Sequence, residues 1–373
     1  MKAGQLYSEL KYFIYGLFLL LLLNELLISS QLLGQLLLFT LGGIFLLITG
    51  SYIREITSDG FEKEKILRNM ESDFELFRKE MEPRIEDIEF TLSKIRQNKL
   101  SLLGIVIIAM FALIAIFAPV LAPPEDPEEP YIMPREGYSS TPQPPDGDYL
   151  MGRTDGQYDI YYGVVWGART AFRVGVLVVG SILLIGLVLG SLAGYYGGWV
   201  DELIMRVVDM VIGLPAIVLV IVVATIFGGS LNNVMAALIF AYWPYYARLI
   251  RSEILSVREE EYVESSRAVG ASDFRIINEH IIPNSSQSLL VMATLDMGTM
   301  VIVAAAISFL GLGPAEGFSD WGALLNLSRD YMTEPGYWYT HVFPGLAIFM
   351  YVLGWTLLSD AFRDITDPWL RRN

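Results

Sequence analysis

The sequence predicts an all-α protein that spans a membrane several times. Apolar residues make up 53% of the 373 positions, a larger share than in an ordinary water-soluble domain. They gather in runs long enough to cross a bilayer as helices, which takes roughly 20 residues each. The charged residues, 18% of the chain, fall mainly between those runs. Apolar runs that alternate with charged loops are typical of an integral membrane protein.

Eight apolar runs are predicted to be transmembrane helices. Two lie close together within residues 1–53, and the other six lie within residues 99–373. We therefore expect six core transmembrane helices plus an additional amino-terminal hairpin. The predicted spans are residues 10–28, 31–51, 100–121, 173–194, 206–228, 231–250, 288–310 and 341–360.

The first apolar run could also be read as a secretory signal peptide, because Asn24 and Glu25 stand near its end. No small-residue cleavage site follows it, and a second apolar run begins at once. These two features favour an uncleaved transmembrane hairpin over residues 1–53.

Residues 54–98 are predicted to form a charged helical arm in the cytoplasm. Their apolar residues recur every three or four positions among charges of both signs, which predicts an amphipathic helix. Pro83 interrupts that spacing and predicts a kink, or two helices end to end. A solvated arm that lies on the membrane or on a neighbouring protein fits this composition better than a coiled coil.

A proline-rich, acidic stretch follows the third predicted span. Residues 122–148 contain a single basic residue, Arg135. Such a segment cannot bury enough apolar surface to form a core of its own. We expect an extended external loop over residues 122–172.

Basic residues set the predicted orientation. Lys94, Arg96 and Lys99 precede the third span, and four arginines lie in the loop 251–284. Because cytoplasmic loops are rich in Lys and Arg, both segments are predicted to lie inside the cell. Following the spans from there puts both termini in the cytoplasm of a multi-pass plasma-membrane protein.

The composition argues against several kinds of site. A net charge of −15 argues against nucleic acid as a partner, since phosphate binding needs clustered Lys and Arg. With no cysteine there is no disulfide or thiolate site. His280 and His341, the two histidines, are predicted to lie on opposite sides of the membrane, so we expect no metal site. We expect no cofactor and no catalytic residue.

The stretch 251–284 is too long and too patterned for a simple connector. Residues 258–269 are rich in charge and suit a short surface helix. Gly270 can adopt the positive φ that ends such a helix. We expect a first helix that stops at this glycine.

A second short helix is predicted directly afterwards. Either Ser272 or Asp273 can cap its start, and Pro283 is predicted to end it. Its apolar residues at helical spacing, expected on one face, are Phe274, Ile277 and Ile281. Two short helices at an angle form a knob that could insert into a groove of another protein.

The motifs in this loop resemble a known family. Glu264, Ser265 and Ser266, followed by Gly270 and then by HIIPN at 280–284, resemble the EAA loop of ATP-binding-cassette (ABC) importer permeases. The string YVESSRAVGAS at 262–272 is similar to the dipeptide and oligopeptide branch. The resemblance extends over about residues 98–373 through GARTAFRVG (167–175), AGYYGGWVDELIMRVVDMVIGLP (193–215), ISFLGLG (307–313), DWGALL (320–325) and FPGLAIF to DAFRDITDPWLR (343–371).

This resemblance implies a type I ABC importer permease fold, with the loop 251–284 acting as a coupling element. It implies a permease subunit that translocates dipeptides and oligopeptides by alternating access. The implied partners are a second homologous permease subunit, two ATPase subunits, an extracellular substrate-binding protein and the lipid bilayer. The implied ATPase-coupling residues are Glu261, Tyr262, Glu264, Ser265, Ser266, Arg267, Gly270, Ala271, His280 and Pro283.

The sequence departs from the family pattern at two places. Ser265 and Ser266 stand where the EAA motif has two alanines, which keeps the side chains small and lowers helix propensity slightly. The segment MGRTDGQYDIYYG before the fourth span matches the family only at Gly152 and Asp159. Any external contact that the family makes there is not implied for this chain.

ATP hydrolysis is predicted to come from partner subunits, because the sequence has no G-x-x-x-x-G-K-[ST] phosphate loop. The rival functions are an ion-coupled secondary transporter, for which no inverted repeat is evident, and a membrane hydrolase, for which no histidine is available in mid-span. Within the importer function, oligosaccharides and nickel are alternative substrates to peptides.

Single residues within the predicted spans favour structural roles or leave the role open. Asp209 lies near Arg206 and favours an ion pair. Glycines at 186, 190 and 194 recur every four residues and predict close helix packing. Pro215 predicts a kink that serves either as a gate or hinge, or only in packing.

Overall fold

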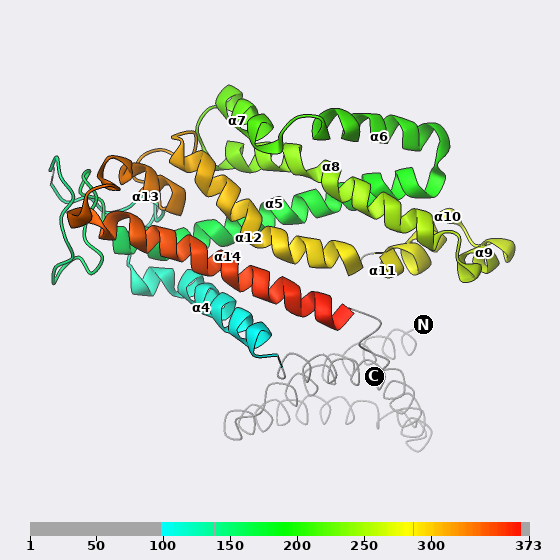
Figure 1. Ribbon diagram of the computed structural model, residues 1–373, viewed down its shortest axis with the longest axis horizontal. Coiled ribbons are helices and arrows are strands. Elements are labelled where there is room, and N and C mark those ends of the chain that lie inside the picture. The colour runs from blue at the N-terminus through cyan, green and yellow to red at the C-terminus, as the bar shows by residue number, and fades with distance from the viewer. Residues whose placement is uncertain (1–97, 138, 286, 367–373) are drawn as a thin grey trace, which may run out of the picture. The chain divides into compact units, whose positions relative to one another are not determined.

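The computed structural model describes residues 98–137, 139–285 and 287–366. These residues belong to one compact unit, which covers residues 89–373. The predicted hairpin (1–53) and the predicted arm (54–98) lie outside the described residues, except for Asn98. Within the described part the regular elements are helices, and β structure is limited to isolated bridges (Figure 1). The all-α prediction is confirmed there.

Four helices in the described part are long and apolar enough to cross a membrane. They confirm the predicted spans 100–121, 173–194, 288–310 and 341–360. The four helices are α4 (Lys99–Leu121), α5 (Ile160–Tyr196), α12 (Gln287–Phe309) and α14 (Tyr339–Thr366).

The fifth predicted span is not one straight helix. It consists of α6 (Gly198–Ile212) and α7 (Ala216–Phe227), which are bent by 86° at the break between them. Pro215 lies in that break; it has no N–H to donate and disfavours a helical conformation at Leu214. The predicted kink is therefore present, and the span predicted over 206–228 corresponds to a bent pair of helices that forms either one broken span or a re-entrant loop.

The sixth predicted span, 231–250, lies within α8 (Leu231–Val257). The helix is longer than predicted, and it is not one of the four helices that are long and apolar enough to cross a membrane. Its sequence explains this, because it holds two asparagines, a proline and charged residues near its end. Its inner face is nevertheless fully buried, as at Leu238, Tyr246 and Ile250.

Helix α8 packs along α5 at three glycines, which we call the glycine seam: Gly186, Gly190 and Gly194. A Cβ atom placed on Gly190 would lie 1.8 Å from Cγ2 of Ile250, and one on Gly186 would lie 2.3 Å from Cβ of Tyr246. These separations are far below van der Waals contact, so no larger side chain fits without movement of a helix. The predicted close packing is confirmed.

Helix α5 begins earlier than its predicted span. Asp159 caps it by accepting a hydrogen bond from the Tyr161 N–H at 2.9 Å. Residues 160–172, predicted to belong to the external loop, are therefore helical. The two arginines in this part, Arg169 and Arg173, are accommodated on the helix: the Arg169 guanidinium lies over the Trp166 ring, and Arg173 donates to Asn232.

The loops at one end of the bundle, residues 122–159 and 310–338, pack together as a loop cap. Ile132 and Phe318 form an isolated bridge, and the Tyr131 and Phe318 rings stack at 5.5 Å. The cap contains α13 (Trp321–Leu327) and the 3₁₀ turns η3 (Arg329–Tyr331) and η4 (Pro335–Tyr337). Asp320 caps α13 through the Ala323 N–H at 2.8 Å.

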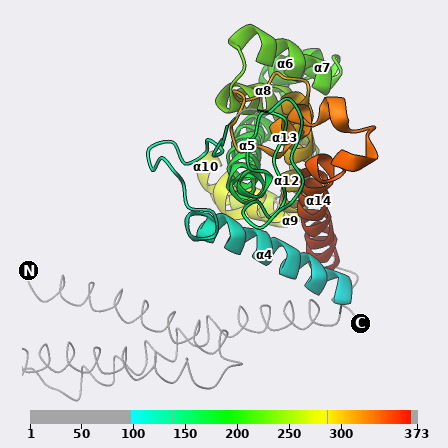
Figure 2. The same cartoon turned by 90° about the vertical axis from the view of Figure 1, so that its left-hand side faces the viewer.

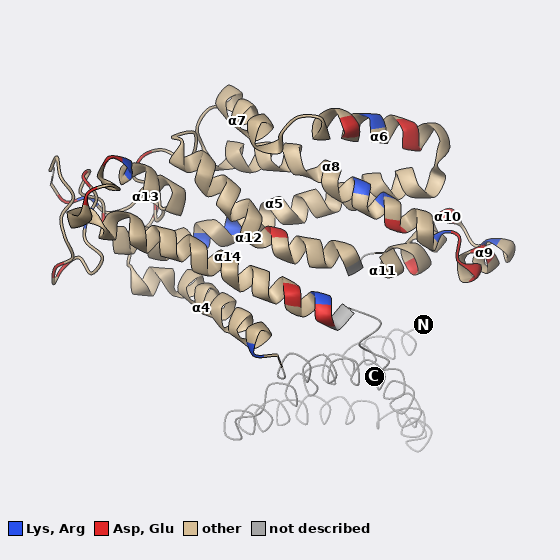
Figure 3. Cartoon of the chain, viewed as in Figure 1, with Lys and Arg blue, Asp and Glu red and all other residues tan. Residues whose placement is uncertain are grey.

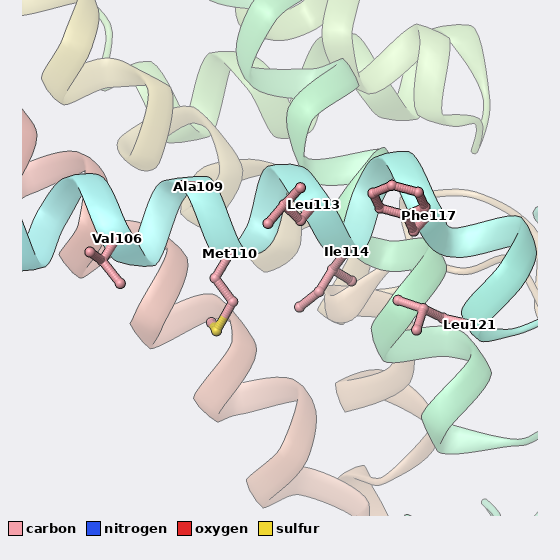
Figure 4. A pocket seen from close by; sticks show the side chains of 7 residues that line it. All are labelled: Val106, Ala109, Met110, Leu113, Ile114, Phe117 and Leu121. Carbon is pink, nitrogen blue, oxygen red and sulfur yellow. The ribbon is translucent and has the colours of Figure 1, made fainter. Parts of the chain in front are cut away.

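Figures 1 and 2 show α5, α8 and α12 in the middle of the bundle, with α6 and α7 on one side and α4 and α14 on the other. Most charged residues lie toward the two ends of the bundle, and a few lie between them on α5 and α12 (Figure 3). The outer face of α4 carries a shallow groove lined by apolar side chains between Val106 and Leu121 (Figure 4). Exposed apolar side chains such as Ile116 and Val120 suit a helix that faces lipid.

Candidate functional site

The candidate site is the loop between α8 and α12, residues 258–285, which we call the coupling loop. It lies at the end of the bundle opposite the loop cap (Figure 1). It contains α9 (Glu261–Ala268), α10 (Asp273–Ile276), the π-helical turn η2 (Ile277–Ile281) and α11 (Ile282–Ser285). The two predicted helical limbs are therefore present.

Helix α9 ends at Ala268, and Gly270 forms the turn that stops it, as predicted. Gly270 has φ +85° and donates its N–H to the Arg267 carbonyl at 3.0 Å, while the Ala271 N–H reaches the Ser266 carbonyl at 3.1 Å. This pair of bonds is a Schellman motif, in which the residue after the helix takes a left-handed conformation. Glycine adopts that conformation without the steric cost that a side chain brings.

The second limb contains a π-helical turn. The Ile282 N–H donates to the Ile277 carbonyl, five residues back. Pro283, which has no N–H, lies directly after this turn inside α11 rather than beyond its end. The prediction that Pro283 ends the helix was wrong, because helical structure continues to Ser285.

The apolar face of the second limb also differs from its prediction. Ile276 and Ile281 are fully buried, whereas Phe274 is 77% exposed. Phe274 therefore belongs to the outer surface and not to the face that packs on the bundle. Neither predicted cap bond forms: the Ser272 side chain makes no capping bond, and the Asp273 carboxylate accepts a hydrogen bond from Tyr195 of α5.

The two limbs pack on each other through three of the predicted coupling residues. Ser266 Oγ lies 3.2 Å from Nε2 of His280, and the Tyr262 ring meets the His280 ring edge-on at 6.3 Å. The Ser266 hydroxyl also donates to the Tyr262 carbonyl at 2.8 Å. Val263, also on α9, is fully buried. Burial raises the pKa of Tyr262 above its usual value.

The other predicted coupling residues do not form one cluster. Gly270 and Ala271 make the turn, and Pro283 lies at the far end of the second limb. Four of these other residues on α9 are exposed, namely Glu261, Glu264, Ser265 and Arg267. Glu261, Glu264 and Ser265 can meet a partner on the outer surface of the loop, whereas the Arg267 guanidinium lies over the Tyr195 ring.

Pro215 lies away from the coupling loop, at the start of α7. Along α6, Asp209 pairs with Arg248 of α8, and Asp201, in the first turn of α6, pairs with Arg251. The predicted ion pair at Asp209 is present, but its partner is Arg248 and not Arg206, because Arg206 pairs with Glu202.

The sequence analysis did not predict the contacts of two residues that hold the coupling loop. Tyr195 donates to Asp273 across 78 positions, and Arg258 donates to the Gly194 carbonyl at 2.9 Å. Tyr195 lies within the motif AGYYGGWVDEL, but no local pattern shows which loop residue it contacts.

Comparison with known proteins identifies the family. Residues 186–372 match the family described as the binding-protein-dependent transport system inner membrane component. The chain belongs to this permease family. Residues 91–145 also match the N-terminal transmembrane domain of oligopeptide transport permease C. The protein is thus a permease subunit of the ABC importer type and a multi-pass inner-membrane component.

Named relatives cover most of the chain. The dipeptide transport system permease protein DppC of Alkalihalophilus pseudofirmus is 39% identical over 74% of this chain and 88% of its own length. The glutathione transport system permease protein GsiD of Pectobacterium atrosepticum is 37% identical over 65% and 81%. The probable D,D-dipeptide transport system permease protein DdpC of Escherichia coli is 35% identical over 74% and 89%.

Solved structures resemble this family member more distantly. An inward-facing structure of the methionine ABC transporter MetNI covers 56% of this chain and 98% of its own, with 19% identity and a TM-score of 0.44. A structure of an amino acid ABC transporter with histidines covers 57% and 94%, with 18% identity and a TM-score of 0.39.

Proposed function

We propose that this chain forms one half of the translocation path of an ATP-driven importer of dipeptides and oligopeptides. In this proposal the coupling loop seats in a separate ATPase subunit, and ATP-driven closure of two ATPases moves the helices by alternating access. A second permease subunit completes the path, and an external binding protein delivers the substrate.

The observation that carries the proposal is the exposed tip of the coupling loop. Val269 is 84% exposed and Phe274 is 77% exposed, and the two stand on either side of the Gly270 turn. Charged residues surround them, among them Arg267 and Asp273. Exposed apolar side chains on an otherwise charged, water-facing loop indicate a protein partner, since aromatic anchors contribute much of the binding energy in interfaces.

The loop is also held together by contacts within this chain. Val263, Ile276 and Ile281 are fully buried, and His280 joins the two limbs through Ser266. A surface that is already ordered loses less conformational entropy on binding. Such internal packing suits an element that must pass a displacement from one protein to another.

The charge distribution supports an orientation with the coupling loop in the cytoplasm. Arginines lie at 248, 251, 258, 267 and 275, in the last part of α8 and in the loop. The opposite end carries the acidic stretch with Glu125, Asp126, Glu128 and Glu129. By the positive-inside rule the first end faces the cytoplasm. The carboxyl terminus, and the amino terminus by the predicted spans, then lie on the same side.

The names of the relatives support peptides as the substrate class. The three relatives described above are named for the transport of dipeptides, glutathione and D,D-dipeptides. All three substrates are short peptides.

The test is co-purification of the chain with the ATPases encoded beside it. Gly270→Val places a β-branched residue at φ +85°, where it is strained, and Glu264→Lys reverses an exposed charge on α9. Both changes should release the ATPases or uncouple ATP hydrolysis from transport. Gly270→Asn, which tolerates a positive φ, and Glu259→Lys, which lies before α9, are the matched controls.

The proposal fails if no ATPase co-purifies with the native chain. It also fails if the two test variants keep the ATPases and couple hydrolysis to uptake as well as their controls do.

A further inference from the structure

Tyr195, near the carboxyl end of α5, contacts both limbs of the coupling loop. Its hydroxyl donates to Oδ1 of Asp273, the first residue of α10, at 2.6 Å. The guanidinium of Arg267 on α9 lies 5.8 Å from the centre of its ring. Tyr195 itself is 8% exposed. One side chain from α5 therefore lies against both helices that flank the Gly270 turn.

These contacts are of the stronger kinds. A hydrogen bond to a carboxylate is worth more than a bond between neutral groups, and a guanidinium over an aromatic ring adds a cation–π attraction. Arg258 contributes a third contact by donating to the Gly194 carbonyl at 2.9 Å. That carbonyl belongs to the last turn of α5, where carbonyl groups have no partner within the helix.

Buried Val263, Ile276 and Ile281 belong to the main core cluster and help to hold the coupling loop on the bundle, and the chain also connects the loop covalently at both ends. These covalent connections are to α8, which ends at Val257, and to α12, which begins at Gln287. Because apolar packing is not directional, it opposes rotation of the loop about the line between these two connections less than a directional bond does. A further attachment on a different helix, α5, opposes that rotation.

We propose that Tyr195 is a positioning residue that fixes the coupling loop to α5, so that a push on the tip of the loop displaces α5 and α8 together. This inference rests on the proposed coupling function. The glycine seam already joins α5 to α8 along their length. Tyr195 completes the connection by stopping the loop from pivoting and absorbing the displacement.

Tyr196 provides a matched control. It is the next residue on the same helix, it is 53% exposed, and it meets the Tyr195 ring edge-on. Tyr195→Phe removes the hydroxyl that bonds Asp273 and keeps the ring beneath Arg267. Tyr196→Phe also removes one tyrosine hydroxyl, but from an exposed side chain. Only Tyr195→Phe therefore removes the hydrogen bond from Tyr195 to Asp273.

The first measurement concerns the position of the loop and needs neither substrate nor ATPase. The chain has no cysteine, so spin labels can be attached to cysteines introduced at Leu184, which is 61% exposed on α5, and at the exposed Ser265 on α9. In the full chain in nanodiscs, Tyr195→Phe should broaden the distribution of label distances, whereas Tyr196→Phe should not. A distribution of equal width in the two variants overturns the proposal.

The second measurement concerns coupling in the assembled importer. Proteoliposomes would be given dialanine, and uptake would be counted per ATP hydrolysed. Loss of a hydrogen bond to a carboxylate should lower this ratio on the order of tenfold in Tyr195→Phe, while Tyr196→Phe keeps it. Asp273→Ala removes the acceptor of this bond and should lower the uptake per ATP. Asp273→Asn keeps an acceptor and should lower it much less.

The outcomes separate this inference from the proposed function. If Gly270→Val releases the ATPases but Tyr195→Phe and Tyr196→Phe give the same ratio, the role of Tyr195 is overturned and the coupling function stands. If no ATPase binds, the proposed partner is wrong. If dialanine is not transported, the proposed substrate class is wrong. The label distances then decide alone whether Tyr195 holds the loop. A merely structural tyrosine would lower protein yield and leave the ratio unchanged.

Discussion

The glycine seam and the coupling loop differ in what determines their residues. At the seam, Gly190 has no room for one added carbon, because Ile250 and the Ala247 carbonyl lie against it. At the tip of the loop, a Cβ atom placed on Gly270 would meet no other group within 4 Å, and Val269 and Phe274 are exposed. The seam is therefore specified by contacts inside the chain, and the tip by the conformation of its turn and by what it meets outside.

The largest expected effect is at the seam. Gly190→Ala should lower the free energy of unfolding by about 1–3 kcal/mol, the usual cost of overpacking. Gly180→Ala, on the same helix with open space around it, should be neutral or slightly stabilising, because alanine favours helix. Unfolding in detergent measures both variants. If Ile250→Ala is combined with Gly190→Ala, the double variant should lose less than the sum of the two single losses.

The next effect tests the contact between α6 and α8. Asp201 and Arg251 form an ion pair that is 20% and 29% exposed, whereas Glu202 and Arg206 form one that is 63% and 70% exposed. Asp201→Asn should cost about 1–2 kcal/mol, and Glu202→Gln less than about 0.5 kcal/mol. Equal losses in thermal unfolding would mean that exposure does not distinguish the two pairs.

A smaller effect, and a dependence on pH, is expected at the loop cap. Burial raises the pKa of Asp320, the cap of α13, above its ordinary value of 3.8. The native state then holds the proton more tightly than the unfolded state, so this group's contribution to stability falls as the pH rises from 3.8 through the raised pKa.

Two variants of Asp320 separate the cap from the charge. Asp320→Ala should cost about 1 kcal/mol through the lost cap. Asp320→Asn keeps an acceptor and removes the charge, so its stability relative to the native chain should increase with pH over the same window. A constant difference between Asp320→Asn and the native chain would contradict the assignment.

The smallest effect on folding is expected at the tip of the coupling loop. Phe274 is 77% exposed, so Phe274→Ala should change the free energy of unfolding by less than about 0.5 kcal/mol. The proposed docking predicts that the same change weakens ATPase binding. If Phe274→Ala strongly lowers the stability of the protein, the contrast between seam and tip is lost. It is also lost if the variant folds like the native chain and binds the ATPases as well.

Much of the fold could be predicted because hydropathy and spacing are local properties. Four spans, the helix over 231–250, the turn at Gly270 and the kink at Pro215 all follow from which residues neighbour one another along the chain. The family resemblance rests on motifs of the same local kind. The start of α5 at Ile160 was missed because Arg169 and Arg173 reduce the hydropathy of a segment whose charges are accommodated by neighbouring side chains.

The sequence by itself determined the membrane class, most spans, the place of the coupling loop and the family. Only the tertiary structure decided the 86° bend between α6 and α7, the pairing of Asp209 with Arg248, the outward position of Phe274 and the contact of Tyr195 with Asp273. The physical reason is how far apart along the chain the interacting residues lie. A helix depends on neighbours three or four positions away, whereas the partner of a polar side chain, or the face that stays exposed, depends on how distant helices pack.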